Sequence, residues 1–523
     1  MAGKSSDHDV QNQLVHHLLD HPECFGHSVD QTEHIETHIS HLLLVGDFVY
    51  KIKKPLNLGF LDFSTLEKRH QFCLEELRLN RRLAPDLYKG VVVIGGTIDQ
   101  PEIGGAGQPL EYAVKMSRFK QQDLFDRRPL GRETIDELAK LIAEFHKNAA
   151  VSLDPSQGTA AWVMLPVMEN FQIIRELKHP LLESERLNNL QTWTEHQANE
   201  LDGLMQERYQ EGKVRECHGD LHLTNITFFE NRITPFDGIE FNPALRWIDI
   251  LSDIAFLLMD LQHRGLSSSA DQLLNRYLEE SGDYAGLPLL RFYLLYRAMV
   301  RAKVSAIRIT QSDLPHQQQP KYVEEYLSYL SLAESLIRHP PASLVITYGL
   351  SGSGKSTVSE QLSEQLMAIR LRSDVERKRL FPDAEKSNAD GNHTRYSGQA
   401  TQITYAHLCA MARRLLQSGF SVTIDAACLK QWQREIFIQM AESLQVPVLI
   451  LECKVRQEVL EKRILSRKQV GVDASEADLD VLSLQQRSIE PLTEKERLHT
   501  LVVDTESFPP QGFLATVLQR LML

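Results

Sequence analysis

Residues 218–225 read His218-Gly219-Asp220-Leu221-His222-Leu223-Thr224-Asn225, and residues 236–238 read Phe-Asp-Gly. A second stretch, residues 349–356, reads Gly-Leu-Ser-Gly-Ser-Gly-Lys-Ser. Both stretches are typical of sites that hold nucleotide phosphates. A protein-kinase-like fold and a P-loop fold do so with different parts, so neither stretch completes the other. The sequence therefore predicts two separate phosphotransferase sites in one chain.

The bulk composition is that of a globular protein with several domains. The chain has 523 residues, of which 42% are hydrophobic and 24% are charged. This length predicts two to four domains. A formal net charge of -13 argues against nucleic acid as a partner. The six cysteines form no CxxC pair and the sequence shows no apolar run of membrane-spanning length, so we expect a cytoplasmic protein with no membrane partner.

The first part of the chain predicts a small strand-rich lobe followed by helices. Residues 42–45 and 48–53 flank a Gly46-Asp47 turn, which is a strong hairpin signal. Residues 63–82 have helical periodicity, with Ser64 or Thr65 as the cap. Further strands are expected at 91–95 and 111–116. Helices are then expected from 133 to 209, interrupted by Pro155, Pro166 and Pro180, and again from 253 to 308.

The domain boundary is predicted at the prolines that follow a helix at 322–338. His339-Pro340-Pro341 stops that helix and favours extended chain. Beyond it, apolar strands alternate with helical stretches, which is the pattern of a parallel α/β sheet. We expect a polar, helical extension at 1–29, one domain at 30–335 and another at 342–523.

The first predicted site has the groups that phosphoryl transfer requires. Asp220 can accept the acceptor's proton, and Asn225 and Asp237 can bind magnesium. Lys51 closes an apolar strand and can reach the α/β-phosphates, although Lys53 and Lys54 are alternatives. The acidic partner of this lysine is expected on the following helix. The candidates for it are Glu76 and Glu75.

The second predicted site is a complete P-loop between an apolar strand and a helix. Its backbone N–H groups and helix N-terminus favour phosphate, Lys355 supplies a cation, and Ser356 offers a hydroxyl to magnesium. The predicted nucleotide-binding residues of this loop are Gly349, Leu350, Ser351, Gly352, Ser353, Gly354, Lys355, Ser356 and Thr357.

Other charged residues distinguish a P-loop kinase from a P-loop ATPase. Asp374 is a candidate base, and Arg377 could bind a substrate anion. Asp425 ends a strand and is a candidate magnesium partner. Arg463 and Arg467 lie four residues apart and could close over the transferred phosphate of the nucleotide, or they could be a solvated helix face.

The first set of motifs resembles the aminoglycoside phosphotransferase family, which includes choline and fructosamine kinases. The resemblance rests on His218-Gly219-Asp220 with Asn225, on Asp237, and on the run 247–255. It implies a bilobal, protein-kinase-like fold for about 30–335, with Met116 in the hinge that receives the adenine. No GxGxxG loop precedes Lys51. This departure argues against a protein kinase more than it argues against ATP binding.

Residues 342–523 resemble P-loop kinases such as gluconate kinase, polynucleotide kinase and zeta-toxin-like kinases, through the P-loop and Arg372-Ser-Asp374-x-x-Arg377. That resemblance implies a three-layer α/β fold. The order of the two domains resembles a bacterial family of bifunctional phosphotransferase and AAA-type ATP-binding proteins. The whole is thus expected to be an α/β and α+β multidomain chain.

The expected function is ATP- and Mg2+-dependent transfer of phosphate to hydroxyl groups of small metabolites at two sites. One alternative is that the P-loop domain phosphorylates nucleotides or nucleic-acid 5′ ends. Another is a regulatory ATP-binding protein or ATPase with one non-catalytic site. No motif identifies either acceptor or the oligomeric state.

Overall fold

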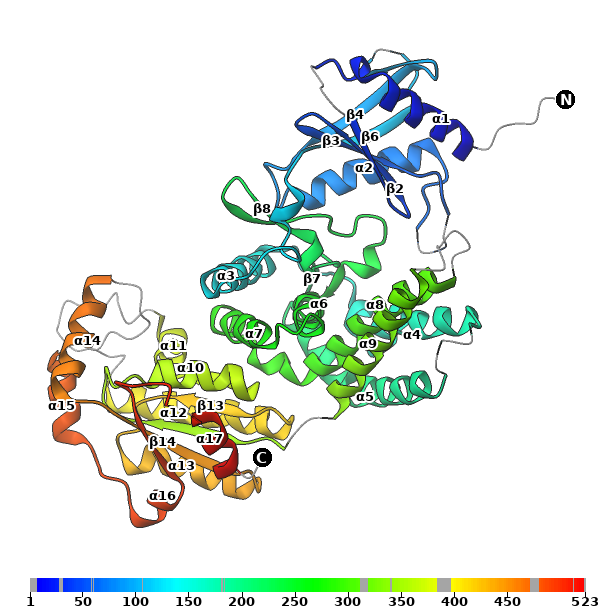
Figure 1. The fold of residues 1–523 in the computed structure, drawn as a ribbon. Coiled ribbons are helices and arrows are strands. Elements are labelled where there is room, and N and C mark those ends of the chain that lie inside the picture. Colours follow the sequence, from blue (N-terminus) through cyan, green and yellow to red (C-terminus); the bar gives the residue numbers. More distant parts are fainter. Residues whose placement is uncertain are drawn as a thin grey trace. The chain divides into compact units, whose positions relative to one another are not determined.

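The structure is a computed structural model (Figure 1). It describes residues 7–27, 32–57, 59, 61–105, 107–179, 182, 184–310, 318–338, 341–382, 397–470, 479–510 and 512–521, without the side chains of 184 and 467–470. The predicted junction at 339–340 lies outside these residues. Within them, no helix combines the length and the apolar character needed to cross a bilayer.

The chain forms two compact units, and each takes two separate stretches of sequence. The first unit combines Met1–Leu261 with Phe292–Leu330, and the second combines Gln262–Arg291 with Ser331–Leu523. The second unit thus includes residues from the middle of the chain. The predicted limits at 30–335 and 342–523 cut the chain at other points and remain predictions.

The N-terminal lobe of the first unit is a six-stranded antiparallel sheet of strand order β1-β2-β3-β6-β4-β5. Its strands are β1 (Thr32–Glu36), β2 (Ser40–Val45), β3 (Phe48–Lys53), β4 (Tyr88–Thr97), β5 (Gln100–Ile103) and β6 (Glu111–Ser117). Val45 pairs with Phe48, so the predicted two-residue turn is confirmed, and Gly46 has the positive φ that such turns favour.

Two helices pack against this sheet (Figure 1). Helix α1 (Asp7–Asp20) buries Leu14, Val15 and Leu18 against apolar side chains of β2 and β3. Helix α2 (Leu66–Asn80) confirms the predicted helix at 63–82, and Thr65 is its cap, accepting a hydrogen bond from the backbone N–H of Lys68 at 3.3 Å. Both helices thus contribute to the core of the lobe.

The rest of the first unit is mainly helical, with short strand pairs that carry the motif loops. Its strand pairs are β7 (Val214–Glu216) with β10 (Trp247–Asp249), and β8 (Ile226–Phe229) with β9 (Arg232–Pro235). The helices of this region are α3 (Arg132–Asn148), α4 (Ala160–Glu176), α5 (Ser184–Gln210), α6 (Ile250–His263), α8 (Leu290–Thr310) and α9 (Gln319–Ile337). The 3-10 helices of the first unit are η1 (Pro22–Phe25), η2 (Gln121–Asp123), η3 (Pro155–Gly158), η4 (Leu223–Asn225) and η5 (Pro243–Leu245), whereas η6 (Tyr284–Leu289) belongs to the second unit.

The second unit is built on a five-stranded parallel sheet of strand order β12-β13-β11-β14-β15. Its strands are β11 (Leu344–Tyr348), β12 (Ile369–Arg372), β13 (Val422–Asp425), β14 (Val448–Lys454) and β15 (Thr500–Asp504). Its C-terminal helices are α10 (Lys355–Leu366), α11 (Ser373–Leu380), α12 (Gly398–Gln417), α13 (Gln431–Ser443), α14 (Gln457–Val470), α15 (Leu479–Ser488), α16 (Glu494–Leu498) and α17 (Phe513–Leu521).

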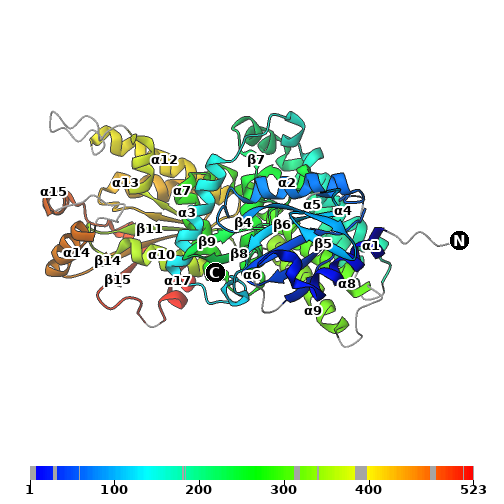
Figure 2. The same cartoon turned by 90° about the horizontal axis from the view of Figure 1, so that it is seen from above.

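Successive side chains of β14 pack against different helices, which shows that this sheet is the middle of three layers. Leu449 and Leu451 pack with apolar residues of α10 and α17, whereas Ile450 packs with Ile438 of α13. Successive side chains of a strand point to opposite faces, so helices cover both faces of the sheet (Figure 2). The predicted three-layer α/β fold is confirmed.

Helix α7 (Ser267–Ser281) is the unexpected part of the second unit. The Asn275 side chain donates to the Ala368 carbonyl at 3.1 Å and accepts from the Arg370 N–H at 2.7 Å. These bonds satisfy backbone groups of β12 and of the residue before it, and β12 is an edge strand of the sheet. Farther along, Arg291 donates to the Ser418 and Gly419 carbonyls at 3.1 and 2.7 Å. The segment 262–291 is therefore held to the P-loop sheet by specific bonds.

A buried carboxyl group lies where α7 meets α10. Asp271 is 8% exposed, and its Oδ2 has no hydrogen-bond partner among the described residues. Burial, and then the charge of Glu364, raise the pKa of Asp271 to about 8. Between pH about 4 and about 8 only the folded chain holds this proton, so its stabilising contribution is lost as the pH rises through the folded pKa.

We therefore expect Asp271→Asn to remove a pH-dependent loss of stability. At pH 9 the variant should exceed the wild type by at least about 1 kcal/mol, because one pKa unit corresponds to about 1.4 kcal/mol. Calorimetric melting between pH 6 and pH 9 measures this difference. Glu280→Gln, on the exposed side of the same helix, is the control. Parallel pH profiles for wild type and Asp271→Asn would contradict the assignment.

Candidate active sites

Strand β3 places two lysines on one face, and both meet the same buried glutamate. Lys51 Nζ lies 2.9 Å from Glu76 Oε1, and Lys53 Nζ lies 2.6 Å from Glu76 Oε2. Burial alone would raise the pKa of Glu76, but the charges of Lys51 and Lys53 outweigh it and lower the pKa to about 2. Glu76 is therefore the carboxylate facing these lysines, whereas Glu75 pairs with arginines and Lys54 pairs with Glu36.

Lys51 also reaches the predicted metal-binding aspartate. Its Nζ forms an ion pair with Asp237, whose side chain is 42% exposed. Asp237 has a φ of 61°, a conformation uncommon for residues other than glycine. Two polar side chains fix the turn: Tyr88 OH accepts from the Asp237 N–H at 3.2 Å, and Asn80 Oδ1 accepts from the Gly238 N–H at 2.7 Å. The strand lysine and Asp237 thus lie in one site.

The predicted base and its neighbouring amide are also brought together. Asn225 Nδ2 donates to Asp220 Oδ2 at 2.9 Å, and His222 Nε2 lies 3.3 Å from Asp220 Oδ1. Burial would raise the pKa of Asp220, but the charges of His222 and His218 outweigh it and lower the pKa. Asp220 is therefore ionised at neutral pH.

The loop that carries Asp220 is fixed from below by helix α6. Asp253 accepts from the backbone N–H groups of His218 at 3.1 Å and Gly219 at 2.8 Å. Gly219 has a φ of 84°, and a Cβ there would lie 2.7 Å from the Leu245 carbonyl oxygen. Only glycine fits this position without displacing the chain.

The donor set of this site fits magnesium. Because Asn225 Nδ2 is bonded to Asp220, the amide oxygen is the atom that could bind a metal. That oxygen and the Asp237 carboxylate are the hard ligands that Mg2+ prefers. Met116, the predicted hinge residue, is buried next to Ser117, the last residue of β6, and packs with Tyr88 and Val114. Its contact with adenine stays a prediction.

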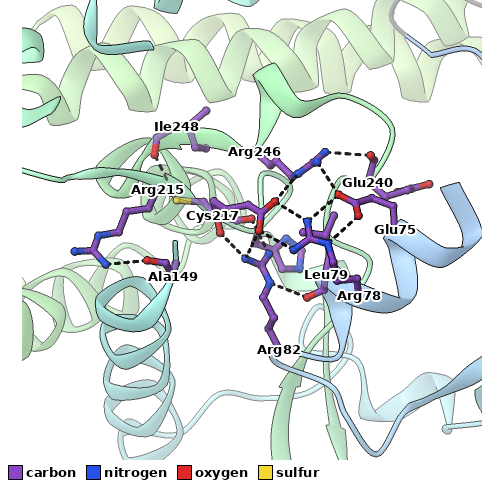
Figure 3. Close-up of polar contacts among 12 residues, drawn as sticks. Glu75, Arg78, Leu79, Arg82, Ala149, Arg215, Cys217, Glu240, Arg246 and Ile248 are labelled. Atoms are coloured by element: carbon purple, nitrogen blue, oxygen red, sulfur yellow. Dashed lines mark hydrogen bonds and ion pairs between the residues drawn. The ribbon is translucent and has the colours of Figure 1, made fainter. Parts of the chain in front are cut away.

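An arginine cluster joins α2 to the strand that leads into the Asp220 loop (Figure 3). Arg78 Nη2 lies 2.7 Å from Glu216 Oε1, and Arg246 Nη2 lies 2.7 Å from Glu75 Oε1. Arg82 donates to the Glu216 carbonyl at 2.6 Å. The cluster thus fixes the helix that carries Glu76 relative to the loop that carries Asp220.

In the second unit, the P-loop has the expected strand–loop–helix geometry. Gly349, Gly352 and Gly354 have φ values of 155°, 81° and 85°. A Cβ on Gly354, which caps α10, would lie 2.9 Å from Thr505. Lys355, the first residue of α10, donates from Nζ to the Leu350 carbonyl at 2.7 Å. Its ammonium group therefore lies over the loop.

The residues predicted to bind magnesium in this unit lie side by side. Ser356 Oγ is 3.3 Å from Asp425 Oδ1, and Asp425 is 6% exposed. Asp425 Oδ2 accepts no hydrogen bond from the described residues, and its near cation is Arg372, with Nε at 3.4 Å. A buried carboxylate oxygen beside a serine hydroxyl fits the oxygen ligation of Mg2+.

The predicted acceptor-side residues begin the helix that follows β12. Asp374 is the second residue of α11, and Arg377 is buried one turn later, with Nη1 3.3 Å from Thr401 Oγ1. Strands β11, β12 and β13 are parallel, so the P-loop, Asp374 and Asp425 follow the same edge of the sheet. Thr357, the last of the predicted nucleotide-binding residues of the P-loop, is exposed on α10.

Arg463 of α14 contacts the P-loop. It donates to the Gly352 carbonyl at 3.3 Å and to the Thr505 carbonyl at 2.8 Å. Of the two alternatives for this arginine, a solvated helix face does not describe its position. Arg467 belongs to the same helix, but its side chain lies outside the described residues.

Comparison with known proteins places each set of residues in a domain family. Residues 60–292 match the phosphotransferase enzyme family, and residues 344–492 match the AAA domain. The chain joins a phosphotransferase domain to an AAA-type P-loop domain. Each matched segment carries its own motif, since the first contains Asp220 and the second contains Lys355.

Relatives in mycobacteria are similar to this chain over most of its length. An uncharacterized protein of Mycobacterium tuberculosis is 29% identical over 463 residues, which cover 86% of this chain and 90% of the relative. A protein of Mycobacterium bovis matches with the same figures.

Solved structures align with parts of the chain. A choline/ethanolamine kinase family protein from Mesorhizobium loti aligns with a TM-score of 0.40 and 11% identity, covering 63% of this chain and 96% of that one. A gluconokinase from Sinorhizobium meliloti aligns with a TM-score of 0.26 and 20% identity, covering 35% and 94%.

Two contacts, one in each domain, were not predicted from the sequence. In the phosphotransferase domain, Glu240 forms a buried ion pair with Lys53. The signal for it was Lys53 itself, because a second lysine on the face of Lys51 requires a second carboxylate. In the P-loop domain, Gln485 of α15 accepts from the Ser351 N–H at 2.9 Å, and no motif predicts that contact.

We expect Glu216→Ala to loosen the phosphotransferase domain, because it removes the carboxylate that contacts all three arginines of the cluster. Removing one partner of a buried ion pair costs about 3 kcal/mol. The melting temperature of the full chain should therefore fall by several degrees. Glu211→Ala, at an exposed residue directly after α5, is the control and should melt like the wild type. Equal melting of all three proteins would show that the cluster does not hold α2.

Proposed function

We propose that this protein is an ATP-dependent phosphotransferase with two separate sites, each of which transfers the γ-phosphate to a hydroxyl group of a small metabolite. One observation carries the proposal. Each compact unit contains its own lysine for phosphate, its own oxygen ligands for magnesium and its own candidate base. We also propose a cytoplasmic location.

In the phosphotransferase domain, the proposed roles follow from the contacts of each side chain. Lys51, held by Glu76, binds the α/β-phosphates. Asn225 and Asp237 hold Mg2+, which when bound neutralises charge on the β- and γ-phosphates. Asp220, ionised at neutral pH, orients the acceptor hydroxyl and takes its proton.

In the P-loop domain, the backbone N–H groups of 349–357 hold the phosphates at the N-terminus of α10. Lys355 moves from the Leu350 carbonyl to the β/γ-phosphates, while Ser356 and Asp425 hold the metal. Asp374 takes the acceptor proton, and Arg377 binds an anionic group of the acceptor. Arg463 braces the loop, and the predicted lid role of Arg467 belongs to this proposal too.

Two other functions make different use of the same residues. In the first, the P-loop domain phosphorylates a nucleotide or a nucleic-acid 5′ end. The net charge of -13 disfavours long nucleic acids but not a nucleotide. In the second, one domain only binds ATP and regulates the other. The presence of a candidate base in each domain, Asp220 and Asp374, favours catalysis at both.

The test compares wild type, Asp220→Asn and Asp374→Asn with labelled ATP and a metabolite extract. Each substitution should reduce one labelled product about 100-fold or more and leave the other unchanged, because a general base contributes roughly that factor. Separation of the labelled products measures both sites at once. Hydrolysis of ATP with no labelled metabolite in any of the three proteins would refute transfer to metabolites. Loss of one product only, with the other absent from the wild type, would support the regulatory alternative.

The two lysines of β3 should differ in effect. Lys51→Ala should weaken nucleotide use by the phosphotransferase domain, because Lys51 contacts Asp237. Lys53→Ala should instead lower the melting temperature, because it leaves Glu240 and Glu76 buried with less positive charge. The KM for ATP of the Asp220-dependent product and the melting temperature are the two measurements. The reverse pattern would make Lys53 the phosphate lysine.

A further inference from the structure

Helix α7 belongs to the phosphotransferase domain by sequence and to the P-loop unit by structure. Residues 60–292 match the phosphotransferase family, yet Gln262–Arg291 lies in the second compact unit. Within that unit, Asn275 bonds the edge strand β12 and Arg379 donates to the Glu279 carbonyl at 2.6 Å. A helix that precedes the P-loop motif in the sequence is thus bonded to the edge of the P-loop sheet.

The end of this helix places a buried carboxylate beside the arginines of β12. Glu279 is 5% exposed, and its Oε1 lies 2.6 Å from Arg370 Nη2. Its other oxygen, Oε2, lies 3.2 Å from Arg372 Nη1. Burial would raise the pKa of Glu279, but Arg370 and Arg372 outweigh it and lower the pKa, so the group is charged at neutral pH.

Arg372 stands between this glutamate and the candidate metal ligand. Its Nη1 faces Glu279, whereas its Nε is 3.4 Å from Asp425 Oδ2. Asp425 also meets Ser356 at 3.3 Å through its other oxygen. One guanidinium therefore links a carboxylate of α7 to a carboxylate of the P-loop site, and it lies closer to the first.

A cation at Asp425 has to compete with Arg372. The attraction between opposite charges grows as they approach, especially at buried positions. Glu279 attracts the guanidinium through Nη1, whereas Asp425 attracts it through Nε. Without that pull, Arg372 is drawn towards Asp425 and opposes a second positive charge there.

We propose that Glu279 is a positioning residue that holds Arg372 back from Asp425 and so sets the magnesium affinity of the P-loop site. This rests on the proposed function, in which Ser356 and Asp425 bind the magnesium of the nucleotide. Helix α7 thus has a role in the P-loop site, although it lies outside the AAA match at 344–492.

The test measures binding of a fluorescent ADP analogue to the full chain as MgCl2 is varied, with melting temperatures alongside. The P-loop share of the signal is the part that Lys355→Ala removes. Glu279→Gln should raise the half-saturating magnesium concentration about three- to ten-fold, in the range of coupling between neighbouring charged groups. Glu280→Gln, the next residue on α7, should leave it unchanged.

A combined variant separates positioning from a general charge effect. In Glu279→Gln/Arg372→Gln the magnesium requirement should equal that of Arg372→Gln alone, because Glu279 acts through Arg372. An equal shift in both backgrounds would overturn the proposal, since Glu279 would then act as a distant negative charge. Asn275→Ala removes the bonds to β12 but no charge, so it should lower the melting temperature without moving the magnesium requirement.

The remaining outcomes are also decisive. If Glu279→Gln does not fold, Arg372→Gln alone still tests the competition, and it should lower the half-saturating magnesium concentration. An unchanged or higher value would overturn the proposal. A signal that Lys355→Ala does not reduce would refute nucleotide binding at the P-loop itself. A P-loop signal that keeps the wild-type magnesium requirement in folded Glu279→Gln would refute only the role of Glu279.

Discussion

A carboxylate without access to water has to meet positive charge, and this constraint organises the phosphotransferase domain. Glu76 is fully buried and meets Lys51 and Lys53, while Lys53 meets Glu240 and Lys51 meets Asp237. The result is a chain of alternating charges from the middle of the sheet to the metal-binding turn. The three inner members, Lys53, Glu76 and Lys51, each have a partner on either side, so moving one of them would leave a buried charge unpaired. The geometry of the site follows from that requirement.

The same constraint recurs at the two places where separate segments have to keep a fixed relation. Glu216 gathers arginines from α2 and from the segment before β10, and Glu279 gathers arginines from β12. In both cases one buried glutamate forms ion pairs with several arginines. Arginine suits this use because its planar guanidinium can donate to two oxygens at once. In both units a buried glutamate therefore holds separate segments of the chain together.

Local signals in the sequence predicted local structure well. The Gly46-Asp47 hairpin, the Thr65 cap and the strand–loop–helix around Lys355 are each encoded within a few residues, and the structure has all of them. Pro166 was expected to interrupt the helices, but it lies inside α4, and packing of the buried Val167 and Phe171 beside it outweighs the lost hydrogen bond. The prediction was wrong there because tertiary contacts decide whether a proline ends a helix.

Contacts between distant segments left no comparable signal. Arg78 meets Glu216 across 138 residues, and Arg370 meets Glu279 across 91. Neither pair has a motif, because arginine and glutamate are common on any helix surface. The choice between Glu75 and Glu76 was likewise open, since adjacent helical positions differ only in which one faces the core. That choice depends on the packed structure.

The covering of β12 by α7 bears on how such a chain can be divided. A cut at the proline-marked junction would release a C-terminal fragment with an uncovered sheet edge and two arginines deprived of Glu279. Unpaired strand edges attract other strands, so such a fragment would be prone to self-association. Genetic separation of the two domains therefore has to leave residues 262–291 with the P-loop part. By that criterion the predicted sequence boundary and the limits of the compact units are different points of the chain.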